Sequence, residues 1–237
     1  SMQIAELINH RILILGLGKE GLSTLAFLRR RFPQLPLHIA DRTPLEGFPK
    51  DIRTHFFGIK NITLHLGKNY LDHLTDFDLI IKTPGISPYI SKIQLALNRG
   101  VRITSQTELF FANTVSKTIG VTGTKGKSTT VSLIYHLLKC AGFNARLGGN
   151  IGTPVLELLD KSYDWVVIEL SSHQLWQVTK SPHIAVFLNI FADHLDYSDF
   201  HSYFDAKKNI ARFQTPSDFF IYNGSFPTLT RFADRVK

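Results

Sequence analysis

Cysteine is nearly absent from this chain, which has one, Cys140, among 237 residues. A single cysteine excludes a disulfide within the chain and is typical of proteins from a reducing compartment. We expect Cys140, on a predicted helix, to be a packing residue. The sequence also lacks an apolar run long enough to span a bilayer and the basic, then apolar, start of a signal peptide. We therefore expect a cytoplasmic protein with no membrane partner.

Acidic residues are outnumbered, with 19 Asp and Glu against 27 Lys and Arg and a formal net charge of +8. The basic residues are scattered, and the one dense cluster is Arg29-Arg30-Arg31. This cluster ends a predicted helix, where cations complement the helix dipole. We therefore expect no nucleic-acid partner and a positive surface that suits anionic, phosphorylated substrates. The length is sufficient for two globular domains.

The chain is organised around residues 120–130, which read Gly-Val-Thr-Gly-Thr-Lys-Gly-Lys-Ser-Thr-Thr. A β-branched stretch precedes this run and apolar residues at helical spacing follow it, as a phosphate-binding loop requires. Lys127 would reach the β- and γ-phosphates, and the hydroxyl of Ser128 or Thr129 would bind Mg²⁺. Because Val121 stands where the common pattern has glycine, a turn that only joins strand to helix is the alternative. The predicted phosphate-binding residues are Gly123, Thr124, Lys125, Gly126, Lys127, Ser128 and Thr129.

A second glycine-rich turn, residues 16–21, lies between a predicted strand at 10–15 and a predicted helix at 22–31. The next strand, 37–41, ends in Asp41, twenty residues beyond Gly21. This pattern is the dinucleotide-fold fingerprint, in which glycines admit a diphosphate and the acid bonds a hydroxyl group. A doubly wound domain with a tight turn and no ligand is the alternative. Further strands at 78–82 and 101–103 and a helix at 90–98 complete an alternating pattern, which predicts a parallel sheet.

Polar residues follow two strands of the second half of the chain. The strand at 163–170 places Glu169 at its carboxyl end, and the strand at 185–189 precedes His194. Ligands of open α/β sheets bind at this edge, so Glu169 facing the phosphate loop is a natural Mg²⁺ ligand. A surface salt bridge for Glu169 and a structural role for His194 are the alternatives. From composition alone, Lys207 and Lys208 on a helical stretch are a solvated face.

Taken together, several segments of the chain, in the order in which they occur, resemble the Mur ligase family of peptidoglycan synthesis. Residues 124–129 are similar to the ATP-binding loop of that family, and Glu-Leu-Ser-Ser-His-Gln-Leu at 169–175 is similar to the member that adds D-glutamate. In the same segment, His173 is similar to the histidine of the member that adds diaminopimelate or lysine. The remaining matching segments are Asp41-Arg42-Thr43, Thr83-Pro84-Gly85-Ile86, Glu108-Leu109-Phe110, Gly149-Asn150-Ile151-Gly152, Asn189 with Asp193-His194-Leu195-Asp196, and residues 203–207.

The resemblance implies an α/β fold, with a Rossmann-like UDP-binding domain at residues 1–112 and an ATP-binding P-loop domain at 113–237. It implies an ATP-dependent ligase of the bacterial cytoplasm that joins D-glutamate to UDP-MurNAc-L-alanine through an acyl phosphate. Lys207 would be carbamylated and hold a second Mg²⁺. The implied catalytic residues are Lys127, His194 and Lys207, and the implied metal ligands are Ser128, Glu169, His194 and Lys207. The implied UDP-substrate ligands are Gly18, Lys19, Asp41, Arg42 and Thr43 for the UDP part, and Asn150, Ser171 and Gln174 for the muramoyl–alanine end.

One departure from the family is large. Mur ligases have a third, C-terminal domain that binds the amino acid, whereas this chain stops at Lys237, with Gly224-Ser225 where an acidic pair is usual. Ser1 before Met2 resembles a cloning scar. We therefore expect an incomplete central domain and a fragment that cannot ligate by itself, since closure completes such sites. Another Mur ligase member and a nucleotide-binding module without ligase activity stay open. An NAD-dependent oxidoreductase would leave the phosphate loop unexplained.

Overall fold

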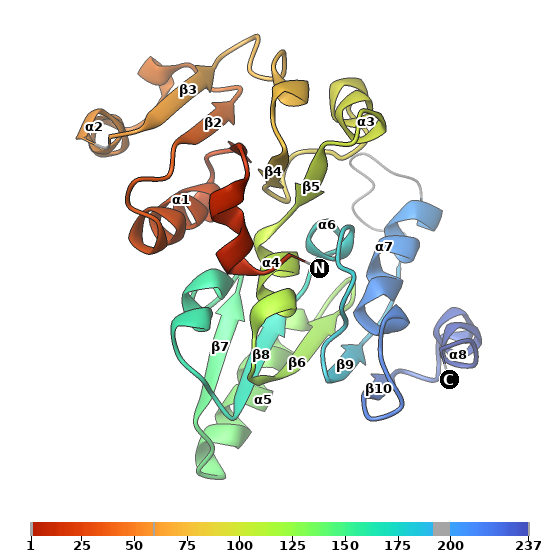
Figure 1. Ribbon diagram of the computed structural model, residues 1–237. Coiled ribbons are helices and arrows are strands. Elements are labelled where there is room, and N and C mark those ends of the chain that lie inside the picture. Colours follow the sequence, from red (N-terminus) through yellow and green to blue (C-terminus); the bar gives the residue numbers. More distant parts are fainter. Residues whose placement is uncertain (1, 59, 192–199, 237) are drawn as a thin grey trace. The chain divides into compact units, whose positions relative to one another are not determined.

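The computed structural model describes residues 2–58, 60–191 and 200–236 (Figure 1). Contacts within the chain divide it into two compact units, one of Met2–Gln106 and one that starts at Thr107. Each unit is an α/β structure around its own parallel sheet, so the α/β prediction is confirmed. None of the helices in the described ranges combines the length and apolar character that a membrane span requires.

The first unit contains a five-stranded parallel sheet in the order β3-β2-β1-β4-β5. Strand order reverses between β1 and β4, which is the point where ligands bind in such sheets. Leu13, Leu15 and Ile80 belong to a core on one face of the sheet. The strands are β1 (Ile12–Leu15), β2 (Leu37–Asp41), β3 (Ile62–Leu66), β4 (Leu79–Lys82) and β5 (Arg102–Thr104), the helices α1 (Lys19–Arg31), α2 (Lys50–Gly58) and α3 (Ser91–Asn98), with 3₁₀ turns Ile4–Asn9, Leu45–Gly47 and Leu74–Asp76.

The second unit contains a parallel sheet in the order β10-β9-β6-β8-β7. Helix α5 packs on β6, β7 and β8, while α7 packs on β6 and β9, and their apolar residues enter two different cores. The strands are β6 (Lys117–Thr122), β7 (Ala145–Gly149), β8 (Trp165–Glu169), β9 (Ile184–Phe187) and β10 (Phe219–Tyr222), the helices α4 (Gln106–Asn113), α5 (Lys127–Cys140), α6 (Ser172–Leu175), α7 (Phe200–Arg212) and α8 (Pro227–Ala233), with a 3₁₀ turn Val155–Asp160.

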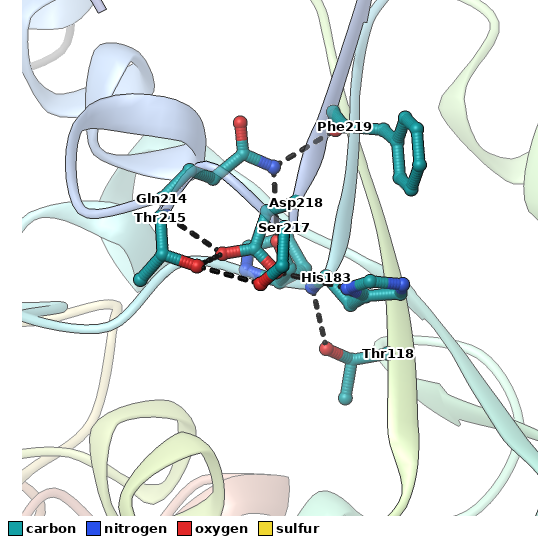
Figure 2. A network of polar contacts seen from close by, with 8 residues as sticks. Thr118, His183, Gln214, Thr215, Ser217, Asp218 and Phe219 are labelled. Atoms are coloured by element: carbon teal, nitrogen blue, oxygen red, sulfur yellow. Dashed lines mark hydrogen bonds and ion pairs between the residues drawn. The ribbon is translucent and has the colours of Figure 1, made fainter. Parts of the chain in front are cut away.

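The amino-terminal edge of the second sheet is fixed by the polar network in Figure 2. His183, just before β9, donates its backbone N–H to Thr118 Oγ1 (3.1 Å), and its Nδ1 lies 2.8 Å from Asp218 Oδ1. The backbone N–H of Thr215 donates to Asp218 Oδ2 at 2.7 Å. Burial alone would raise the pKa of Asp218, but hydrogen bonds from Thr215 and His183 outweigh it and lower the pKa. The network thus ties the starts of β6, β9 and β10 together, on the edge away from the phosphate loop.

The expectation that Cys140 packs inside the fold is wrong. Its side chain is exposed at the end of α5, and its Sγ lies 3.5 Å from Nε2 of His136 one turn earlier. Only Val131 of α5 is buried, because this helix covers the sheet with one narrow stripe. The helical spacing of apolar residues therefore predicted the helix, but it did not predict which face of the helix packs on the sheet.

Candidate functional site

The predicted phosphate loop joins β6 to α5 as a strand–turn–helix. Gly123 has φ of +154° and Gly126 has φ of +85°, and Gly126 is the residue that precedes the first turn of α5. A left-handed φ strains any residue with a Cβ, so glycine is required at Gly126. The fourteen-residue helix α5 begins at Lys127 and directs the partial positive charge of its N-terminus at the loop. The loop therefore has the backbone form of an anion-binding site.

Two polar side chains hold this loop: Asn189, two residues after β9, and Lys127, the first residue of α5. Asn189 Oδ1 accepts hydrogen bonds from the backbone N–H groups of Thr124 and Lys125, both at 2.9 Å. Asn189 Nδ2 donates to the carbonyl of Lys125 at 3.0 Å. Lys127 Nζ donates to the carbonyls of Gly123 and Thr124, both at 3.1 Å. Asn189 was not predicted as a site residue, although it belongs to one of the segments that resemble the Mur ligase family.

Ser128 and Glu169 meet beside the loop. Ser128 Oγ donates to Glu169 Oε2 at 2.7 Å, and Glu169 ends β8 with 6% of its surface exposed. A hydroxyl and a carboxylate oxygen so close together fit two positions in the oxygen shell of Mg²⁺. His194, the other predicted ligand from this edge, lies outside the described residues. Within the described ranges no group of three or more His, Cys, Asp or Glu side chains has a geometry that holds a metal.

Lys207 is buried at the same edge, with 2% of its surface exposed. Its Nζ donates to Thr122 Oγ1 at 3.2 Å and to the carbonyl of Gly123 at 3.0 Å. Burial and, to a smaller extent, the charge of Lys127 lower the pKa of Lys207 to about 7, against the attraction of Glu169. The expectation of a solvated face is wrong for Lys207, whereas Lys208 forms a partly exposed ion pair with Asp205 at 2.7 Å.

Tyr203 is a second residue that sequence reasoning did not assign to the site. Its Oη lies 3.1 Å from Thr124 Oγ1, and the Lys207 Nζ lies 4.8 Å from the centre of its ring. Thr124 Oγ1 also accepts the backbone N–H of Phe191 at 3.0 Å. Tyr203 and Lys207 are four residues apart on α7 and so share a helix face, which was the available signal.

The three residues predicted to contact the muramoyl end of a substrate lie together. Ser171 Oγ accepts the backbone N–H of Gln174 at 3.2 Å, and Gln174 Oε1 accepts the N–H of Ser171 at 2.9 Å. This pair is a capping box that starts α6. Gln174 Nε2 donates to Asn150 Oδ1 at 3.4 Å, which joins the loop after β7 to α6. Their role in binding a substrate stays a prediction.

The first unit has a cavity of about 630 Å³ at the reversal of strand order. This volume lies within the usual range for small-molecule sites, about 300–1,000 Å³. All five residues predicted to bind UDP line it, and so do Phe48, Tyr70 and the loop 83–87. Those five residues are Gly18, Lys19, Asp41, Arg42 and Thr43.

Asp41 shapes this cavity through both carboxylate oxygens. Oδ2 accepts the backbone N–H of Leu17 at 2.7 Å, and Oδ1 accepts that of Thr43 at 2.8 Å. Gly16, with φ of +97°, packs so closely that an added Cβ would lie 2.1 Å from Thr83 Oγ1. Asp41 and Gly16 therefore fix the glycine turn at the N-terminus of α1, where an anion is favoured.

Comparison with known proteins follows the same division of the chain. The sequence pattern of the Mur ligase MurD-like N-terminal domain matches residues 10–105, and that of the Mur ligase middle domain matches residues 121–237. The structure of UDP-N-acetylmuramate:L-alanyl-gamma-D-glutamyl-meso-diaminopimelate ligase from Neisseria meningitides is similar, with a TM-score of 0.59. That likeness covers 95% of this chain and 75% of the other at 19% identity, which supports the fold alone.

Curated relatives are more similar in sequence. The UDP-N-acetylmuramoylalanine--D-glutamate ligase of Acetivibrio thermocellus is 37% identical over 233 residues, which are 97% of this chain and 49% of that protein. The ligase of the same name from Symbiobacterium thermophilum is 36% identical, over 97% of this chain and 50% of its own. The chain spans about half the length of the curated relatives it matches. It belongs to the Mur ligase family, with a MurD-like N-terminal domain followed by a Mur ligase middle domain.

Proposed function

We propose that this chain carries the nucleotide-binding part of an ATP-dependent ligase that adds D-glutamate to UDP-MurNAc-L-alanine in the bacterial cytoplasm. The observation that supports it most is the meeting of the phosphate loop, Glu169 and Lys207 at one sheet edge. The relatives that match 97% of the chain are named for this reaction. In this proposal residues 1–112 bind the UDP part of the substrate and residues 113–237 bind ATP.

The proposed reaction needs the substrate carboxylate to become an electrophile. The carboxylate takes the γ-phosphoryl group of ATP, which gives an acyl phosphate and ADP. The amine of D-glutamate attacks the acyl carbon, inorganic phosphate leaves and the amine proton is lost. Because two anions meet in the first step, cations must offset their repulsion. Lys127, freed from the carbonyls of Gly123 and Thr124, would reach the transferred phosphoryl group.

The metal proposal follows from the oxygen ligands at the loop. Ser128 and Glu169 would hold one Mg²⁺, which when bound would offset the phosphate charge. As an ammonium Lys207 repels a cation; as a carbamate it would become an anion able to hold a second Mg²⁺. His194 is proposed as a further ligand and catalytic group.

The nucleotide part of the proposal is tested by titrating a non-hydrolysable ATP analogue with Mg²⁺ into the protein in a calorimeter. Lys127→Ala should weaken binding at least tenfold, since Lys127 would contact the phosphates. Lys139→Ala, at the other end of α5, is the matched control and should leave the affinity unchanged. Equal affinities for wild type and Lys127→Ala would refute the assignment of the loop.

A nucleotide-binding module without ligase activity remains the alternative. It predicts the same binding of the ATP analogue, so the second substrate separates the two. Under the ligase proposal the first unit binds the UDP part of UDP-MurNAc-L-alanine, and Arg42→Ala weakens the binding of this substrate while Lys127→Ala does not. A chain that binds ATP and no muramoyl nucleotide would support the module.

A further inference from the structure

Lys82 is a buried lysine that the proposed reaction does not use. It ends β4, in register with Leu15 at the end of β1, and has 4% of its surface exposed. Strand β4 is otherwise apolar, with Leu79, Ile80 and Ile81 buried. Charged side chains are rarely buried without a partner or a task. A lysine at the end of this strand therefore calls for a specific reason.

The ammonium of Lys82 joins the two ends of one turn. Its Nζ donates to the carbonyl of Thr83 at 3.1 Å and to the carbonyl of Ile86 at 2.7 Å. The backbone N–H of Ile86 also donates to the carbonyl of Thr83 at 3.3 Å, closing the turn around Pro84 and Gly85. Lys82 thus holds from inside a turn whose outer side lines the cavity of the first unit.

The turn is also fixed from the side of β1. The backbone N–H and the hydroxyl of Thr83 both donate to the carbonyl of Leu15, at 2.9 and 3.1 Å. Gly16 packs closely against Thr83, since an added Cβ would lie 2.1 Å from Thr83 Oγ1, so the glycine turn and the loop 83–87 are in direct contact. A displaced loop would therefore change the cavity on both sides of the reversal point.

Charge gives a second reason for a cation at this place. Glu20, in the first turn of α1, lines the cavity, and its negative charge acts on Lys82. An uncompensated carboxylate there would repel a diphosphate. Burial lowers the pKa of Lys82 to about 8, against the attraction of Glu20, so holding this cation inside the fold costs stability. A residue that lowers stability and contacts a ligand-lining loop is typical of a functional position.

We propose that Lys82 is a positioning residue that holds the loop 83–87 in its ligand-binding form and offsets Glu20, so that the cavity accepts a nucleoside diphosphate sugar. Lys82 does not line the cavity, so it acts through the loop. The inference rests on the proposed function of the first unit. It assigns to Lys82 a contribution to affinity that is separate from any contribution to folding.

The test compares Lys82→Met, Lys82→Gln and a control, Lys92→Met, whose lysine forms an exposed ion pair with Asp72. Amide hydrogen exchange of residues 83–87 is measured without ligand, and the affinity for UDP-MurNAc-L-alanine is measured by calorimetry. Lys82→Met should speed exchange in this loop and weaken binding at least tenfold, without a fall in the unfolding midpoint. Lys82→Gln keeps a donor and should lose less affinity. The control should match wild type.

Unchanged exchange in the loop, or unchanged affinity in folded Lys82→Met, would overturn the proposal. So would a loss of affinity that only follows a matching loss of stability. If Lys82→Met does not fold, Lys82→Gln decides by the same two readouts. If wild type itself does not bind the muramoyl nucleotide, the proposed function of the first unit fails, and the exchange data decide alone whether Lys82 holds the loop.

Discussion

Replacing Lys207 by methionine should make the protein more stable. Burial and the charge of Lys127 lower the pKa of Lys207 from 10.5 to about 7. At about 1.4 kcal/mol per pKa unit, this cation costs the folded state up to about 5 kcal/mol at a pH below 7. Methionine has a similar length and carries no charge, so it removes this cost.

The hydrogen bonds lost with the ammonium leave no polar group unpaired. Thr122 Oγ1 still donates to the carbonyl of Leu170 at 2.7 Å, and the carbonyl of Gly123 still accepts Lys127 Nζ. Each lost bond costs about 1 kcal/mol. We therefore expect Lys207→Met to raise the free energy of unfolding at pH 6.5 by about 3 kcal/mol.

The stability difference between Lys207→Met and wild type should depend on pH in a defined direction. Below pH 7 Lys207 is protonated in both states and the full cost is present. Between pH 7 and about 10.5 Lys207 is protonated in the unfolded chain and mostly neutral in the folded one. The free energy of unfolding of wild type therefore rises with pH, and the advantage of Lys207→Met shrinks. Urea unfolding is measured at pH 6.5, 8 and 9.5 in buffer free of CO₂, which prevents carbamate formation, with Lys208→Met as control. A variant less stable than wild type at pH 6.5, or a difference independent of pH, would refute the reasoning.

Three further changes probe the loop and the opposite edge of the second sheet. Asn189→Ala removes three hydrogen bonds to the loop and, at about 1 kcal/mol per bond, should weaken binding of the ATP analogue by up to about a hundredfold in calorimetry. Gly126→Ala, at φ of +85°, should cost about 1–2 kcal/mol in urea unfolding, whereas Gly224→Ala, whose Cβ meets no atom within 4 Å, should cost far less. Asp218→Asn should lower the free energy of unfolding at pH 7, and the free energies of variant and wild type should converge as pH falls through the lowered pKa of Asp218. A difference between them that does not change with pH would argue against a charge effect.

Much of the fold follows from the sequence because local patterns and tertiary packing agree. Strand β2 has its predicted bounds, and the α/β order was confirmed in both units. Strand β3 and strand β7 were not predicted as strands. The first is only partly buried, and the second ends in two glycines, so neither carries the apolar run of a central strand.

The phosphate loop was predictable because glycine spacing, lysine and helix start coincide in one short run. The packing around it was not. Lysine is rarely buried, so composition favoured a solvated face for Lys207. Lys82 contacts the loop 83–87 from the end of β4, and Asn189 contacts the phosphate loop from just beyond β9. At such positions no periodic pattern in the sequence indicates where a side chain points. Such contacts depend on which strands become neighbours, and this is fixed only by the complete sheet.

The most direct measurement is a calorimetric comparison of UDP-MurNAc, UDP-MurNAc-L-alanine, UDP-MurNAc-L-alanyl-D-glutamate and NADH as ligands of this chain. The account predicts that UDP-MurNAc-L-alanine binds most tightly, that Arg42→Ala weakens it, and that NADH does not bind. Preference for UDP-MurNAc or for the dipeptide precursor would assign the chain to another member of the family. Binding of NADH alone would contradict the proposed function of the first unit.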